Sequence, residues 1–212
     1  MRKINFYGYV YLVLIFSGII SPGTFSQPVW VTQNPLPQCN TINDVQFIGA
    51  STGYEAGSYG TILKTTNGGL NWVSQVSGTT ENLKSVFFLN ANTGFIAGGQ
   101  NAWVILKTTN GGVNWALSNL GNGGGFLAIN FADANTGIAC GTGSLLMRTT
   151  NGGTNWNSVS LAATSFHSIY LSSALTGYIA AANGNVYKTI NGGVNWSVQS
   201  TVNTNPLYAV SF

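Results

Sequence analysis

Charged side chains are scarce in this sequence. Of 212 residues, seven are Lys or Arg and four are Asp or Glu, so 5% of the chain is charged, whereas about 25% is typical of globular proteins. A solvated, disordered chain needs more charge than this, and that class is excluded. Arg2 and Lys3 lie in an N-terminal export segment, which leaves the rest of the chain close to neutral. Without a basic stripe, we expect no nucleic-acid partner.

Residues that hold metals or form disulfides are also rare, with one His and two Cys. Cys140 occupies a position at which the other repeats described below have Ala, so we expect a small buried side chain there. Export would permit a disulfide between Cys39 and Cys140, but we favour two free thiols and leave their pairing open. His167 has no partner motif and is expected at a solvated surface. We expect no metal site and no cofactor.

Glycine and aromatic residues are abundant instead, with 28 Gly and 12% Phe, Trp and Tyr. Aromatic side chains supply a core, and glycine supplies tight turns between short strands. Outside the first 26 residues, no segment shows a sustained helical period of 3.6 residues. This composition predicts an all-β protein.

Residues 1–26 have the pattern of a secretory signal peptide. Arg2 and Lys3 precede an apolar stretch at 9–20, and small residues precede Gln27. An uncleaved anchor is the alternative, but the stretch is short for a membrane span of about 20 residues. We therefore predict a protein that is secreted to the periplasm, the cell surface or the medium, with no stable membrane insertion after cleavage.

Two short motifs recur along the chain with one period. The first, which we call the box, reads Thr-x-Asn-Gly-Gly-x-Asn-Trp, and the second is Thr-Gly followed by an apolar residue. Copies of both are 40 to 43 residues apart, so the chain is a repeat protein. The box residues that we expect to be structural are Thr65, Asn67, Gly69, Trp72, Thr108, Asn110, Gly112, Trp115, Thr149, Asn151, Gly153, Trp156, Thr189, Asn191, Gly193 and Trp196.

Each repeat contains four short β patterns, of which the third ends at the box and the fourth begins at its Trp. Neighbouring apolar residues in the third pattern, such as Ile62 and Leu63, indicate a sheet that is covered on both faces. A four-stranded unit of about 40–45 residues packed between copies of itself is a propeller blade. We predict a β-propeller of antiparallel blades at 41–76, 77–119, 120–160 and 161–200.

Partial repeats flank these four blades. Residues 27–40 form a lead-in whose segment 30–33 matches a fourth, outer strand, and 201–212 match the first strand of a fifth blade. A closing blade made from these two strands would lack its middle strands, whereas closed propellers have about 4–8 complete blades. We therefore expect an incomplete propeller whose remaining blades belong to a longer chain.

The box resembles the Asp-box of bacterial neuraminidase repeats, Ser/Thr-x-Asp-x-Gly-x-x-Trp. Together with the adjoining Gly-apolar strand and the Ile-Leu-Lys-Thr-Thr run at 62–66, it makes residues 30–212 similar to the photosystem II stability/assembly factor propeller family. Asn stands here where the pattern has Asp, and Asn forms the same side-chain-to-backbone turn. Because every blade carries the box, we assign it a structural role.

The resemblance implies one of two activities. Sialidase-like relatives need an arginine cluster, and glucanase-like relatives need a pair of carboxylates. Arg148 aligns with a lysine before each other box (Lys64, Lys107 and Lys188), so we interpret it as a repeat feature whose stem packs on the blade while its charge reaches water. The acids Asp44, Glu55, Glu81 and Asp133 form no convincing pair. The photosystem factor branch is non-catalytic and implies a scaffold that binds a partner protein.

Binding residues are expected on the face opposite the boxes, because its turns differ from blade to blade. The candidate contacts are Tyr59, Gln100, Asn101 and Trp103, suited to stacking and hydrogen bonding with a peptide or sugar. Trp103 has a second interpretation, in which it folds back onto its blade. Glu55 replaces apolar residues of the other blades, so it is either functional or reaches solvent at the central channel. Residues 119–125 are expected to form a Gly-rich crossover, and segment 121–125 within it is interpreted as flexible rather than as a phosphate loop.

These observations favour a secreted, non-enzymatic propeller that binds a protein or glycan through its variable face. One alternative is an Asp-box glycosidase whose catalytic residues lie beyond this chain, and a second is a structural spacer in a large surface protein.

Overall fold

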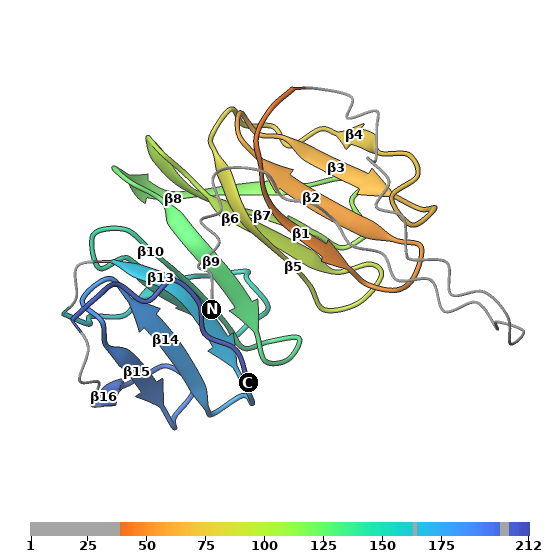
Figure 1. Cartoon of the computed structure of the whole chain (residues 1–212). Coiled ribbons are helices and arrows are strands. Elements are labelled where there is room, and N and C mark those ends of the chain that lie inside the picture. Colours follow the sequence, from red (N-terminus) through yellow and green to blue (C-terminus); the bar gives the residue numbers. More distant parts are fainter. Residues whose placement is uncertain (1–38, 163–164, 200–203) are drawn as a thin grey trace, which may run out of the picture.

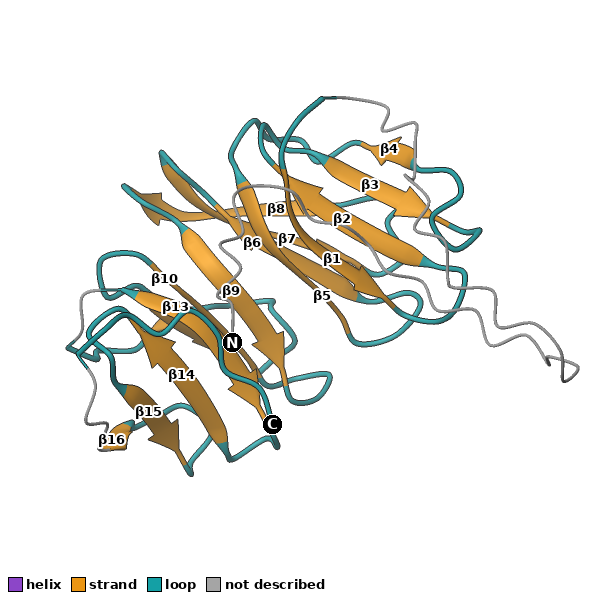
Figure 2. Ribbon diagram, in the orientation of Figure 1, coloured by secondary structure: helices purple, strands orange, loops and turns teal. Residues whose placement is uncertain are grey.

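The structure is a computed structural model that describes residues 39–162, 165–199 and 204–212. The predicted signal peptide and the predicted strand at 30–33 lie outside the described residues. Every regular element in the described ranges is a β-strand, as Figure 2 shows. None of these residues forms a helix with the length and hydropathy of a membrane span.

Sixteen strands form four sheets of four, each built from consecutive strands in the order of the chain (Figure 1). Blade 1 contains β1 (Ile42–Phe47), β2 (Gly53–Gly57), β3 (Ile62–Thr65) and β4 (Val73–Gln75). Blade 2 contains β5 (Leu83–Phe88), β6 (Gly94–Gly98), β7 (Ala102–Thr108) and β8 (Ala116–Asn122). Blade 3 contains β9 (Phe126–Phe131), β10 (Gly137–Gly141), β11 (Leu146–Thr149) and β12 (Asn157–Ser158). Blade 4 contains β13 (Phe166–Leu171), β14 (Gly177–Ala181), β15 (Val186–Thr189) and β16 (Ser197–Gln199).

All strand pairs are antiparallel, and the first strands of successive blades contact one another. The first strands β1, β5, β9 and β13 are therefore innermost, and the fourth strands lie at the periphery. This arrangement confirms the predicted class, an incomplete propeller of four-stranded blades.

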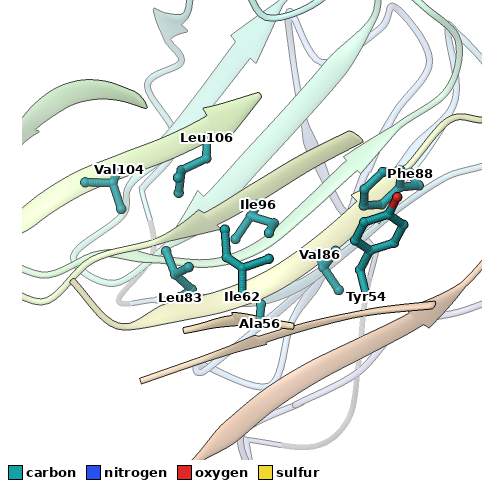
Figure 3. Close-up of a cluster of buried hydrophobic side chains, with 9 residues drawn as sticks. All are labelled: Tyr54, Ala56, Ile62, Leu83, Val86, Phe88, Ile96, Val104 and Leu106. Atoms are coloured by element: carbon teal, nitrogen blue, oxygen red, sulfur yellow. The ribbon is translucent and has the colours of Figure 1, made fainter. Parts of the chain in front are cut away.

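The core lies between the blades. Figure 3 shows Tyr54, Ala56 and Ile62 of blade 1 facing Leu83, Val86, Phe88, Ile96, Val104 and Leu106 of blade 2. Equivalent clusters join blade 2 to blade 3 and blade 3 to blade 4. Because both faces of an inner blade are covered in this way, apolar residues occur on both parities of its strands.

Inner strand edges are closed by side chains from the preceding blade. Asp44 Oδ2 accepts the backbone N–H of Val86 at 2.8 Å, and Ser85 Oγ accepts that of Ile129 at 3.3 Å. Unpaired strand edges favour aggregation, and these contacts cover the free edges of the innermost strands.

Residues 204–212 form no strand, although 201–212 were predicted to form one. They nevertheless occupy the place of a first strand, since the N–H of Val210 donates to Ser168 Oγ at 3.2 Å, as Ile129 does to Ser85. The ring centroids of Phe212 and Tyr178 are also 4.5 Å apart. This contact is equivalent to that of Phe88 with Tyr54 between blades 1 and 2. The described chain places no second strand beside this segment, so no ladder forms there.

Blade 2 extends beyond its predicted limit at residue 119, because β8 continues to Asn122. Its partner β7 is lengthened too, and the Trp103 ring lies flat on Gly121, where a Cβ atom would approach the ring to 2.4 Å. The predicted crossover at 119–125 is therefore mostly strand, because a glycine lets the indole cover the backbone.

Candidate functional site

The Thr and Asn side chains of the box make the same hydrogen bonds to the backbone in every blade. In blade 1, Thr65 Oγ1 accepts the backbone N–H of Gly69 at 2.9 Å, and Asn67 Oδ1 accepts that of Asn71 at 2.9 Å. The other three boxes repeat these contacts within 0.1 Å. A neutral Asn therefore closes the turn as an Asp would.

The boxes of blades 2, 3 and 4 also receive a cation from the blade before them. Lys64 Nζ donates to the carbonyl of Gly111 at 2.6 Å, and Lys107 Nζ donates to that of Gly152 at 2.6 Å. Arg148 Nε makes the same bond to Gly192. These three side chains are only partly buried, so the bond to the carbonyl of the neighbouring box turn is a role that the sequence did not predict and that adds to the packing of their stems.

Tyr59 lies on the opposite face, in the turn between β2 and β3. Its backbone φ is +55°, and that of Gly60 is +70°. In the same turn of blade 3 a glycine, Gly143, takes the position of Tyr59 with φ +64°. A left-handed conformation costs a non-glycine residue roughly 1–2 kcal/mol. Tyr59 bears this strain while 73% of its surface stays exposed, so its side chain contributes little packing in return.

A brace joins this turn to blade 2. Glu81 Oε2 accepts the backbone N–H groups of Gln100 at 2.6 Å and Asn101 at 3.0 Å. Asn82 Oδ1 accepts the N–H of Tyr59 at 3.2 Å, and its Nδ2 donates to Gln100 Oε1. The structure thus brings together three predicted contacts from two different blades.

Glu81 and Asn82 were missed as members of this site. The signal was present, because Glu81 is the only charged residue between Lys64 and Lys84. A charge retained in an otherwise neutral crossover indicates a specific partner, here two backbone N–H groups at the end of a neighbouring hairpin.

An open groove of about 680 Å³ lies beside the brace, between blades 1 and 2. Tyr59 and the crossover after β4 form one wall, and Ala102, Leu117 and Asn119 of blade 2 form the other. Glu81 is the single charged residue among the described residues that line it. The groove is therefore nearly neutral, with an exposed aromatic ring at its rim.

Trp103 adopts the second of its two predicted roles. It packs against the core between blades 2 and 3, and its indole Nε1 donates to the carbonyl of Gly123. The ring and its donor are thus used inside blade 2, which separates Trp103 from the groove.

Glu55 does not join the groove either. It lies on β2 at the position of Ile96 and Ile179, which face the preceding blade, so it points away from blade 2. Its Oε2 is enclosed and has no hydrogen-bond partner, and burial raises the pKa of this carboxyl to about 7. The expectation that it reaches solvent was wrong for this oxygen.

Both cysteines are free, as favoured from the sequence. Cys140 is buried in the core between blades 3 and 4, and burial raises the pKa of its thiol well above the ordinary range. This thiol is therefore a packing group and not a nucleophile.

A family model described as photosynthesis system II assembly factor YCF48 matches residues 24–123 and 73–207. The chain belongs to this family. No curated protein matches it.

Solved structures place this YCF48-family chain among propellers. YCF48 bound to a D1 peptide is 23% identical with a TM-score of 0.64, covering 82% of this chain and 58% of that one. YCF48 from Cyanidioschyzon merolae is 20% identical with a TM-score of 0.63, covering 84% and 62%. An ancestral GH74 enzyme is 20% identical with a TM-score of 0.67, covering 79% and 27%. The chain thus spans less than two thirds of each of these proteins, and the likeness concerns the fold.

The acids of this YCF48-family chain are used as follows. Asp44 caps Val86, Glu81 caps the hairpin of blade 2, and Asp133 caps the turn before Thr136 at 2.7 Å. Backbone hydrogen bonds lower the pKa of Asp133. Glu55 points away from blade 2, whereas Glu81 lines the groove between blades 1 and 2. Glycoside hydrolysis requires two carboxylates that face one cleft. The described residues present no such pair.

Proposed function

We propose that this chain is a secreted, non-catalytic propeller that binds a protein or glycan partner through the face opposite the boxes. The observation that carries the proposal is Tyr59, held exposed in a left-handed conformation at the rim of the groove. Strain that is retained without a packing gain is typical of functional positions. Binding also explains the brace, because it fixes Tyr59, Gln100 and Asn101 before a partner arrives.

Family membership supports a protein partner. A YCF48 structure is described as bound to a D1 peptide, so a member of this family has held a polypeptide segment. The groove here is open and has one charged residue along its described lining, which suits a peptide or a sugar chain better than a compact, highly charged ligand.

The test is a binding screen on the purified native chain, against a phage-displayed random decapeptide library and a glycan array. Hits are measured again on Tyr59→Gly and on the control Leu70→Ala. Leu70 is also an exposed large side chain, at 66%, but lies in a box. We expect Tyr59→Gly to weaken binding about tenfold or more, because a hot-spot aromatic contributes roughly 2 kcal/mol. Equal affinity of the two variants would contradict the proposal.

A glycosidase is the second candidate, favoured by the fold likeness to GH74 enzymes, among them a xyloglucanase. It is tested by incubating the native chain with xyloglucan and following reducing ends. We expect no turnover, because the acids of the described residues cap backbone groups or stand alone. Turnover that Glu55→Gln abolishes would support the glycosidase instead.

Secretion is tested separately from binding. Expression of residues 1–212 followed by N-terminal sequencing of the exported protein should give Gln27 as the first residue. An intact N-terminus in the membrane fraction would support the uncleaved anchor.

A further inference from the structure

The outer strand of blade 2 differs from those of the other blades. β8 has seven residues, whereas β4, β12 and β16 have three, two and three. It is the last strand of its sheet, so no described strand pairs with its outer edge (Figure 1). Proteins usually shorten such edges or place charges or proline on them, and β8 contains neither charge nor proline.

The regular part of this edge runs from Ala116 to Asn119. A shift in register leaves Leu120 without a partner on β7, and Gly121 then resumes the pairing opposite Trp103. In blade 3 the N–H of Val159 donates to the carbonyl of Leu146, and the equivalent pair in blade 2 is Ser118 with Ile105. Because bonded and non-bonded pairs alternate in an antiparallel ladder, Leu117 and Asn119 turn their N–H and C=O groups outward.

The same two residues line the groove, and Leu117 packs against the core between blades 1 and 2. A strand added to β8 would therefore direct alternate side chains into the groove, toward Tyr59 and the crossover of blade 1. In such binding, main-chain hydrogen bonds give affinity and the pockets beside the strand give specificity.

Among the described residues, the groove also contains one charged residue, Glu81. Glu81 Oε2 is used by the hairpin of blade 2, while no described residue donates to Oε1. With this carboxylate as the single charge in a neutral groove, the complementary segment carries one basic residue and is otherwise uncharged.

We propose that the outer edge of β8 takes up an extended segment of a partner protein as a fifth strand of blade 2, with a Lys or Arg of that segment opposite Glu81. This inference rests on the proposed binding function and adds to it the class of partner and the mode of binding.

The experiment uses decapeptides selected from the phage library on the native chain. Amide exchange of the ¹⁵N-labelled protein is measured with and without saturating peptide. We expect exchange at Leu117 and Asn119 to slow about tenfold or more, and exchange at Ala116 and Ser118, already bonded to β7, to change little. The selected peptides should be enriched in Lys or Arg at one position.

Two further measurements address the backbone directly. Methylation of single peptide nitrogens should weaken binding about tenfold at alternate residues, following the period of a strand. Asn119→Pro removes the outward N–H and should weaken binding about tenfold, whereas the matched Asn119→Ala, which keeps that N–H, should change it less than threefold. The peptide series remains decisive if the proline variant does not fold.

Peptides that bind without slowing exchange at Leu117 and Asn119 would overturn strand addition and leave the binding function intact. The same holds if glycans bind in place of peptides, or if light scattering shows a dimer in which exchange at Leu117 and Asn119 is already slow without peptide. Selected peptides without a basic residue would overturn the assignment of Glu81. The proposed function itself fails if neither screen yields a ligand, or if Tyr59→Gly and Leu70→Ala bind the selected ligand equally well.

Discussion

The two faces of this propeller are made by the same strands but follow opposite rules. On the box face, four turns repeat one set of hydrogen bonds, and the cation of one blade reaches the box of the next. On the opposite face each turn is different, and one of them holds a strained, exposed tyrosine. Contacts that repeat serve the fold, which every blade needs, and contacts that occur once are free to serve a partner.

Matched glycine substitutions give the largest expected difference between the faces. Both Gly153 in a box and Gly143 in a variable turn have positive φ, but a Cβ on Gly153 would lie 2.8 Å from the Phe95 ring, and on Gly143 it would meet nothing within 4 Å. Gly153→Ala should lower the free energy of unfolding by roughly 2–5 kcal/mol, through strain plus a clash in a packed core. Gly143→Ala should cost about 1–2 kcal/mol from strain alone. Urea unfolding measures both, and equal losses would remove the distinction between the faces.

Removal of a box hydroxyl should have the next largest effect. Thr108 is buried, and its Oγ1 accepts the N–H of Gly112 at 2.9 Å. Thr108→Val keeps the shape and leaves that N–H unpaired, so we expect a loss of about 1–3 kcal/mol. The exposed neighbour Thr109 is the control, and Thr109→Val should stay within about 0.5 kcal/mol. A Thr108→Val protein as stable as Thr109→Val would show that the box hydroxyl is dispensable.

Glu55 predicts a pH dependence of unfolding. Burial raises the pKa of its carboxyl from 4.5 to about 7 in the folded chain, so the folded state holds this proton more tightly than the unfolded state does. The corresponding stability is complete below about pH 4.5 and is lost as the pH rises to about 7. Glu55→Gln should remove this slope and gain roughly 1–2 kcal/mol at pH 8, a figure reduced for partial exposure of the group. Parallel stability profiles of the two proteins between pH 4.5 and 8 would refute the assignment.

The smallest expected change is a gain in stability. Tyr59→Gly relieves a left-handed conformation but makes the unfolded chain more flexible, so the net gain should be about 0.5–1 kcal/mol. Ser144, with φ +63°, is the control, and Ser144→Gly should gain a similar amount. Thermal unfolding measures both variants. A loss of stability in Tyr59→Gly would show that the ring packs in the fold and is not held out for a partner.

Much of the fold could be predicted from the sequence, because the sequence pattern of one blade occurs four times. The box, the Thr-Gly motif and the alternating first strand each recur with one period, so a single interpretation of one repeat holds for all. The site could be predicted in part: Tyr59, Gln100 and Asn101 follow from the variation between turns. Three features could not be predicted, because each depends on how one blade packs against the next. They are the hydrogen bonds of Glu81 to blade 2, the bonds from the cations before the boxes to the next box, and the orientation of the Glu55 side chain. The extension of β8 depends on Trp103 covering Gly121, a contact that no local pattern specifies.

Binding through the face opposite the boxes is tested most directly by mapping the backbone amide shifts of the ¹⁵N-labelled chain as a selected decapeptide is added. We predict shifts at Tyr59, Gln100, Asn101 and the Ala116–Asn119 part of β8, with the box residues Gly69, Gly112, Gly153 and Gly193 unchanged. Shifts concentrated in the boxes, with the variable turns unaffected, would contradict binding through the face opposite the boxes.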